Sequence, residues 1–172
     1  REKHPLVHNI TNYVTVNDVA NILLACGGSP IMADDSGEGE DITSICQGLN
    51  INIGTLNKNT IPSMFLAGKK ANVLGHVVLL DPVGAGASGL RTKTANELVR
   101  DIKFTVIRGN ISEIRTLMEG TGNTKGVDAD LADAVTEENL DETIGKLKAF
   151  SEATGSVIAV TGAIDLVAVS YT

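Results

Sequence analysis

Aromatic residues are scarce in this sequence: they make up 3% of its 172 residues, and tryptophan is absent. A core therefore has to be filled by Val, Ile, Leu and Ala, the usual filling of parallel strands that are buried on both faces. The sequence also lacks a run of apolar residues long enough to cross a bilayer. We therefore expect a globular protein with no membrane-spanning segment.

Cysteine and positive charge are also limited. Cys26 and Cys46 do not form a Cys-x-x-Cys pair, so neither a disulfide framework nor a zinc site is indicated, and a cytoplasmic location fits. We expect Cys26 to be buried because it ends an apolar run. With 14 Lys and Arg against 21 Asp and Glu, the net charge is −7. No basic stripe is visible, so neither a nucleic-acid partner nor an anionic membrane surface is expected.

Apolar runs typical of strands alternate with segments of helical spacing. The predicted strands are residues 30–33, 49–55, 77–80, 104–107, 157–160 and 165–169, the last two forming a hairpin. The predicted helices are residues 15–26, 60–72, 92–101, 111–118 and 136–153. Residues 6–14 are polar enough to predict a loop. The alternation predicts an α/β fold with a mostly parallel sheet, formed by residues 1–172 as a single domain.

The chain is organised around residues 77–89, where an apolar strand ends at Asp81 and opens into a loop with three glycines. Those glycines match the Gly-x-Gly-x-x-Gly pattern of dinucleotide-binding loops. A plain tight connection explains them equally well, because the next strand ends in Arg108 and not in the acidic residue that a ribose requires. Asp81 is a second functional feature, since a carboxylate at a strand end can hold a metal ion or a hydroxyl.

Polar residues also follow the other predicted strands. Arg108 can form a bidentate contact with phosphate oxygens. Glu113, near the start of a predicted helix, can hold Mg²⁺ or a metal-bound water, although an Arg108–Glu113 surface salt bridge is an equally good interpretation. The carboxyl ends of parallel strands share one edge of a sheet, so Asp81, Arg108, Glu113 and Thr161 are expected to converge there. Such a set suits phosphoryl transfer, where positioning and charge neutralisation carry most of the catalysis.

Taken in order, several stretches closely resemble the hydroxyethylthiazole kinase family. The matching stretches are residues 5–12, 29–33, 52–56, 81–87, 107–114, 125–128 and 160–165. The resemblance covers nearly the whole chain. It implies a ribokinase-like layered fold, with a mostly parallel central sheet flanked by helices and truncated at its C-terminus.

The resemblance also implies an activity. Members of the family transfer a phosphoryl group from ATP, with Mg²⁺, to the hydroxyl of 4-methyl-5-(2-hydroxyethyl)thiazole in thiamine salvage. They are expected to be homotrimers with active sites between subunits. Another ribokinase-like kinase, of the hydroxymethylpyrimidine or pyridoxal type, remains an alternative. So does a non-catalytic nucleotide-binding module of a fused thiamine enzyme.

By matching positions, the resemblance assigns roles to residues of the substrate pocket. Met32 would contact the thiazole through its backbone, and Asn12 and the turn at Gly54 would line the same pocket. Asp81 would be the catalytic carboxylate near the substrate hydroxyl. These four positions define the expected acceptor site.

The resemblance assigns the nucleotide to other positions. Arg108 and Thr161 would contact ATP, and Glu113 and Asp81 would lie beside the phosphates and Mg²⁺. The family carries a later Gly-(Thr/Ala)-Gly-Cys segment, which forms the anion hole and supplies a cysteine beside the substrate hydroxyl. This sequence stops before that segment, so we expect these 172 residues to be inactive alone.

Overall fold

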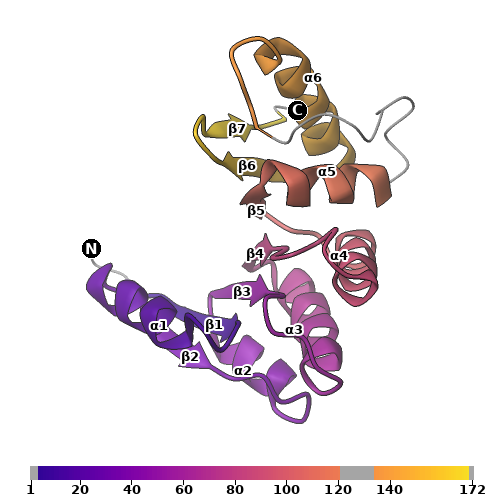
Figure 1. Ribbon diagram of the computed structural model, residues 1–172. Helices are drawn as coiled ribbons and strands as arrows, with labels where there is room; N and C mark the ends of the chain where they lie inside the picture. Colours follow the sequence, from indigo (N-terminus) through magenta and orange to yellow (C-terminus); the bar gives the residue numbers. More distant parts are fainter. Residues whose placement is uncertain (1–3, 121–133, 171–172) are drawn as a thin grey trace. The chain divides into compact units, whose positions relative to one another are not determined.

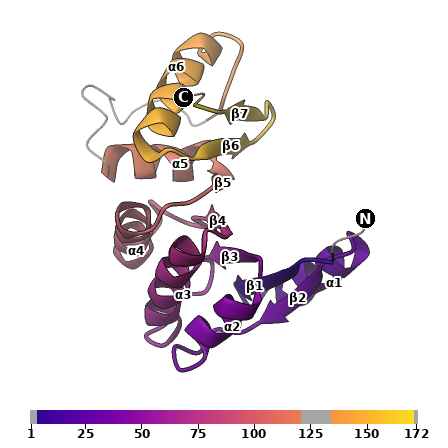
Figure 2. The ribbon, with the colours of Figure 1, turned by 180° about the vertical axis from the view of Figure 1, so that it is seen from behind.

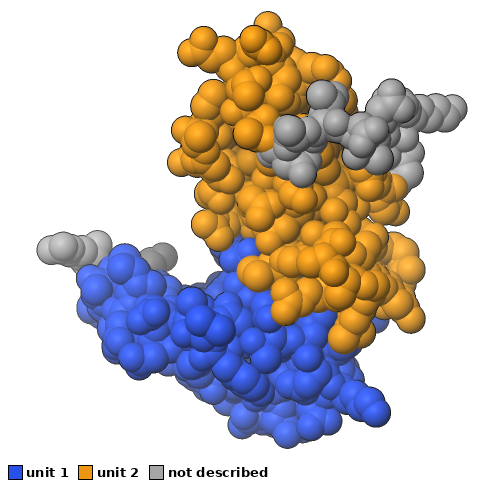
Figure 3. Space-filling model, viewed as in Figure 1, with its two compact units in different colours: residues 1–81 blue, residues 82–172 orange. Residues whose placement is uncertain are grey.

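The computed structural model describes residues 4–120 and 134–170 (Figure 1). The chain forms two compact units, residues 1–81 and residues 82–172, which are coloured separately in Figure 3. Each unit is an assembly of strands and helices in its own right. The expected single domain over residues 1–172 stays a prediction, and the matching stretch at 125–128 lies outside the described residues.

Unit 1, residues 1–81, has four parallel strands in the order β2-β1-β3-β4. The strands are β1 (Leu6–Ile10), β2 (Ser29–Met32), β3 (Gly48–Asn52) and β4 (Val77–Asp81). The register pairs Asn52 with Asp81, so β3 and β4 end side by side. This pairing brings two polar residues together at the carboxyl edge of the unit.

Three helices belong to unit 1: α1 (Val16–Ala25), α2 (Gly39–Ile45) and α3 (Thr60–Leu74). The two ribbon views agree in placing α2 and α3 side by side (Figures 1 and 2). Helix α3 buries Met64 and Ala67, and it ends at Gly75, whose φ of 69° suits a residue without a Cβ. No residue of α1 is buried. Cys26, which directly follows this helix, is exposed, contrary to expectation.

The predicted loop at residues 6–14 is wrong, because Leu6–Ile10 forms strand β1 between two neighbours. The polar residues that suggested a loop are buried but hydrogen-bonded. His8 Nε2 lies 2.8 Å from the Ala33 carbonyl oxygen, and His8 Nδ1 lies 2.9 Å from Thr43 Oγ1. Burial of a polar group costs little when it is paired, and a hydropathy pattern does not reveal pairing over such sequence distances.

Unit 2, residues 82–172, contains the parallel pair β5 (Val106–Asn110) and β6 (Val157–Thr161). Strand β7 (Leu166–Ala168) pairs antiparallel with β6, which confirms the predicted hairpin. The helices are α4 (Gly89–Asp101), α5 (Ile111–Gly120) and α6 (Leu140–Thr154). Together the two units confirm an α/β fold with mostly parallel strands.

Element boundaries in unit 2 differ from the prediction at three places. Helix α4 begins earlier, since Ser88 caps it by accepting a hydrogen bond from the Arg91 amide at 3.3 Å. Strand β5 continues through Asn110, so Arg108 lies within the strand. Helix α6 begins at Leu140 because the residues before it form a turn, in which Asn139 Oδ1 accepts from the Thr136 amide.

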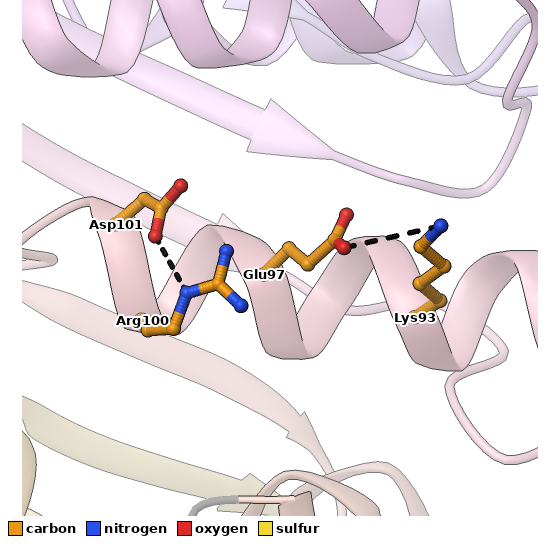
Figure 4. A network of polar contacts seen from close by, with 4 residues as sticks. All are labelled: Lys93, Glu97, Arg100 and Asp101. Atoms are coloured by element: carbon orange, nitrogen blue, oxygen red, sulfur yellow. Dashed lines mark hydrogen bonds and ion pairs between the residues drawn. The ribbon is translucent and has the colours of Figure 1, made fainter.

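Two ion pairs lie on the charged face of α4 (Figure 4). Lys93 Nζ lies 4.0 Å from Glu97 Oε1, and Arg100 Nε lies 2.8 Å from Asp101 Oδ1. The hydrogen bond to Asp101 raises the pKa of Arg100, and the pair is solvated, so it adds little to stability. No helix within the described ranges is long and apolar enough to cross a membrane.

Candidate functional site

Strand ends of unit 1 carry a chain of side-chain hydrogen bonds that leads to Asp81. Asn12 Nδ2 donates to Asn52 Oδ1 at 3.1 Å, and Asn52 Nδ2 donates to Asp81 Oδ2 at 3.1 Å. Asn12 and Asn52 are both 8% exposed. The ends of β3 and β4 and the segment after β1 therefore meet through buried amides at one carboxylate. The predicted strand at residues 49–55 gave Asn52 no functional role, so this role was not predicted.

Gly54 is required by this close approach. A Cβ at this position would lie 2.9 Å from Asn12 Cβ and 2.9 Å from Asn52 Oδ1, distances that real Cβ atoms do not show. The Gly54 amide also donates to Asn52 Oδ1 at 2.9 Å. Asn12 and Gly54, which the resemblance assigned to one pocket, are thus in direct proximity.

Met32 ends β2, which is the outermost strand of unit 1. The Ala33 amide donates to the Asn9 carbonyl oxygen of β1 at 3.3 Å. Since successive amides of a strand point to opposite sides, the Met32 N–H and C=O point away from β1. This direction suits the backbone contact that the resemblance assigns to Met32.

The segments that follow Asn12 and Met32 in the chain help to form a polar hollow that sequence reasoning missed. It has a volume of about 480 Å³. The lining residues are Tyr13, Asp34, Asp35, Asn57, Lys58, Asn59 and Thr60. The Tyr13 hydroxyl lies 3.5 Å from Asp34 Oδ2. Residues 34–41 are rich in acidic side chains, a pattern typical of a solvated run, and no local pattern joins them to residues 57–60.

Glu113 forms a capping box at the start of α5. Its Oε2 accepts from the Asn110 amide at 2.9 Å, while Asn110 Oδ1 accepts from the Glu113 amide at 2.9 Å. The other oxygen, Oε1, accepts from the Gly84 amide at 2.8 Å. Glu113 therefore has a structural role that joins the glycine loop to α5. The Asn-x-x-Glu spacing was a signal that could have revealed it.

The glycine loop is built as a connection within unit 2. Gly84 and Gly86 have φ values of 75° and 93°, which favour residues without a Cβ. The Gly84 amide is bonded to Glu113, and the Gly86 amide donates to Thr92 Oγ1 at 2.9 Å. Since protein oxygens occupy both amides, these glycines do not form a phosphate cradle in this conformation, which favours the tight-connection interpretation.

Thr161 and Arg108 lie on the paired strands β6 and β5. Thr161 lines a hollow of about 350 Å³ together with Asn110, Ser112, Val135 and Gly162. This volume is within the range of about 300–1,000 Å³ typical of small-molecule sites. Arg108 is exposed on β5, and it is not among the residues that line the hollow. Of the two residues predicted to contact ATP, Thr161 lines this hollow and Arg108 does not.

Within unit 2, the structure brings Thr161 and the Asn110–Glu113 box to the same strand ends, because Asn110 pairs with Thr161. Asp81 belongs to unit 1. The predicted convergence of Asp81 with Arg108, Glu113 and Thr161 therefore stays a prediction.

Magnesium was expected at Glu113 and Asp81. Among residues 4–120 and 134–170, no cluster of three or more His, Cys, Asp or Glu side chains could hold a metal ion. Mg²⁺, however, keeps several waters and needs only one or two carboxylates besides substrate phosphates. Each Glu113 oxygen accepts one amide and keeps a lone pair, so the residue fits a contact to a metal-bound water.

Comparisons with solved structures first identify the fold class of this chain. A ribokinase-like superfamily protein from Enterococcus faecalis superposes with a TM-score of 0.55 at 9% identity over 96% of this chain and 60% of that one, which shows the fold. The structure of a hydroxyethylthiazole kinase protein from Pyrococcus horikoshii superposes with a TM-score of 0.83 at 38% identity, over 98% of this chain and 59% of that one. The fold is thus ribokinase-like.

Sequence comparison then defines the family. The model of the hydroxyethylthiazole kinase family matches residues 1–171. A hydroxyethylthiazole kinase of Clostridium acetobutylicum is 68% identical over 98% of this chain and 62% of its own length. The chain therefore belongs to the hydroxyethylthiazole kinase family, and it spans about 60% of the length of such relatives.

Proposed function

We propose that the complete protein transfers the γ-phosphoryl group of ATP to the hydroxyl of 4-methyl-5-(2-hydroxyethyl)thiazole in thiamine salvage. The observation that carries this proposal is the 68% identity to the Clostridium acetobutylicum hydroxyethylthiazole kinase over 98% of this chain. Because the chain spans 62% of that relative, the activity is proposed for the complete protein.

Asp81 is the proposed catalytic residue. Its carboxylate accepts the hydrogen bond, and then the proton, of the substrate alcohol as the alcohol oxygen attacks phosphorus. Asn12, Gly54 and the backbone of Met32 bind the thiazole. Support comes from the contact of Asn12 with Asn52 and from the outward direction of the Met32 backbone groups.

Arg108 and Thr161 are the proposed ATP contacts. The Arg108 guanidinium remains charged and suits a bidentate phosphate contact. Thr161 contributes a hydroxyl at the hollow of about 350 Å³. Bound Mg²⁺ would neutralise charge on the phosphates, and Glu113 would orient a water of its shell while it keeps its two backbone amides.

A cytoplasmic homotrimer is part of the same proposal. Support for an interface comes from α1, which has no buried residue and exposes Ile22 and Leu24 at 62% and 58%. Tyr13 and Val14, just before α1, are also exposed at 60% and 87%. Light scattering of the complete protein gives the oligomeric state directly.

The test is a phosphotransfer assay with labelled ATP. The complete protein is expected to phosphorylate the thiazole alcohol and to leave hydroxymethylpyrimidine and pyridoxal unmodified. Phosphorylation of either of those two alcohols in preference to the thiazole would overturn the assignment. The 172-residue chain is expected to show no turnover under the same conditions, and nucleotide binding without turnover by the complete protein would favour a non-catalytic module.

A further inference from the structure

The direction of the hydrogen-bond chain in unit 1 is determined by two backbone amides. The Thr15 amide donates to Asn12 Oδ1 at 3.0 Å, and the Gly54 amide donates to Asn52 Oδ1 at 2.9 Å. A backbone N–H can only donate, so each of these contacts identifies the oxygen of the side-chain amide. Asn12 Nδ2 must then face Asn52 Oδ1, and Asn52 Nδ2 must face Asp81.

The last bond of this chain fixes the direction of a carboxylate oxygen. Asn52 Nδ2 donates to Asp81 Oδ2 at 3.1 Å, so this oxygen is held toward β3. Reversal of the Asn52 amide would place its oxygen against the carboxylate and its NH₂ group against two donors. The surroundings therefore disfavour a flip of Asn52, and the donor stays directed at Asp81.

We propose that Asn52 is a positioning residue for the kinase reaction, which holds the Asp81 carboxylate in a fixed orientation through the Thr15–Asn12–Asn52 chain. This inference rests on the proposed role of Asp81 as the catalytic carboxylate. The amide of Asn52 bonds to Asn12, Gly54 and Asp81, so Asn52 acts through Asp81. The chain also links the substrate pocket, through Asn12, to the reacting carboxylate.

The chain is built from parts that are distant in sequence. The bonds join residues 40 and 29 positions apart, and they lie at the ends of neighbouring strands. Both asparagines are 8% exposed, so loss of one partner leaves a buried polar group unsatisfied. The arrangement is therefore rigid, as positioning requires.

Asn52→Asp tests the proposal with almost no change in shape. A carboxylate oxygen then faces Asp81 Oδ2 in place of the donor, so the Asp81 carboxylate is no longer held in its orientation. We expect kcat of the complete protein to fall by about tenfold or more, while the Kd for the thiazole stays within a few-fold. An unchanged kcat would overturn the proposal, and so would an equal loss of kcat and of binding, which would indicate a merely structural role.

Asn50→Asp is the matched control. Asn50 lies two residues earlier on β3, on the same face, and its Nδ2 donates to Asn9 Oδ1 at 3.2 Å. Asn50 pairs in register with Leu79 and not with Asp81. The same charge change here is expected to leave kcat within a few-fold of its value in the unsubstituted protein. An equal fall of kcat in both variants would indicate a general charge effect and would contradict the proposal.

Carboxyl ¹³C NMR separates this inference from the proposed function. At a single pH, the carboxyl chemical shift of Asp81 is expected to move in Asn52→Ala, because the donor to Asp81 Oδ2 is lost, and to stay in place in Asn50→Ala. An unmoved shift in folded Asn52→Ala would refute the positioning role. If Asp81→Asn leaves kcat unchanged while the shift moves in Asn52→Ala, the catalytic role of Asp81 is wrong and Asn52 still positions its carboxylate.

Discussion

The two carboxylates expected at the active site are held in different ways in the two units. Asp81 in unit 1 accepts a hydrogen bond from a side-chain amide, Asn52 Nδ2. Glu113 in unit 2 accepts two bonds from backbone amides, those of Gly84 and Asn110. A side chain that donates a hydrogen bond can be removed by substitution, whereas the backbone amides are present in every variant. The hydrogen bond to Asp81 can therefore be changed by mutation of Asn52, while Glu113 has a structural role at the start of α5.

The largest effect is expected for Asp81→Asn. We expect kcat of the complete protein to fall by about 100-fold or more, because general base catalysis typically contributes that much. The Kd for the thiazole should stay within a few-fold, since the carboxylate acts mainly in the transition state. Steady-state kinetics and calorimetric binding check both values. Equal losses in binding and kcat/KM would make Asp81 a binding residue.

Gly54→Ala should disrupt the Asn12–Asn52 contact in unit 1. The added Cβ would lie 2.9 Å from two buried atoms, so we expect a loss of about 1–3 kcal/mol in the free energy of unfolding. Urea denaturation measures it. Gly145→Ala is the control, because nothing lies within 4 Å of a Cβ there. Similar stability of the two variants would show that the approach at Gly54 is not tight.

Glu113 allows its structural and chemical roles to be separated. Glu113→Ala removes the capping box and should cost about 1 kcal/mol of stability. Glu113→Gln keeps the bond to the Asn110 amide, since glutamine also completes such a box, but it loses the charge and the bond from the Gly84 amide, which its NH₂ group cannot accept. If the carboxylate orients a metal-bound water, the Gln variant will need more Mg²⁺ for half-maximal rate. An unchanged Mg²⁺ requirement would leave Glu113 a capping residue alone.

The smallest effect concerns His8 in unit 1. Burial lowers the pKa of His8 below its ordinary value of 6.5. As pH falls from about 6.5 toward the folded-state pKa, the unfolded chain binds a proton that the folded chain does not, so stability is lost in that window. Urea denaturation at several pH values should show this slope, which His8→Gln should remove.

His4→Gln is the control for this prediction, because His4 is exposed and bonds only at the surface, with Nδ1 2.9 Å from the Gly27 carbonyl oxygen. It should leave the pH slope of stability unchanged. A slope that survives in His8→Gln would assign the pH dependence to another group.

The sequence by itself determined the α/β alternation, the strand ends and the family. Apolar periodicity is local, and most helices and strands satisfy their own pattern within about a dozen residues. The matching stretches also named Asp81, Arg108, Glu113 and Thr161 without saying which atoms hold them. Helix α2 was not predicted. Strand β1 was missed because its buried His8 and Asn9 look like loop residues until their partners are known.

Tertiary structure alone decided how the named residues are held. The partner of Asp81 is 29 residues away, and that of the Gly84 amide is also 29 residues away. Hydrogen bonds between residues so far apart in sequence depend on strand register and on the close approach of Asn12 and Asn52 at Gly54. Neither can be read from a short stretch of sequence. For this reason Asn52 could be identified only after β3 and β4 were seen to end side by side.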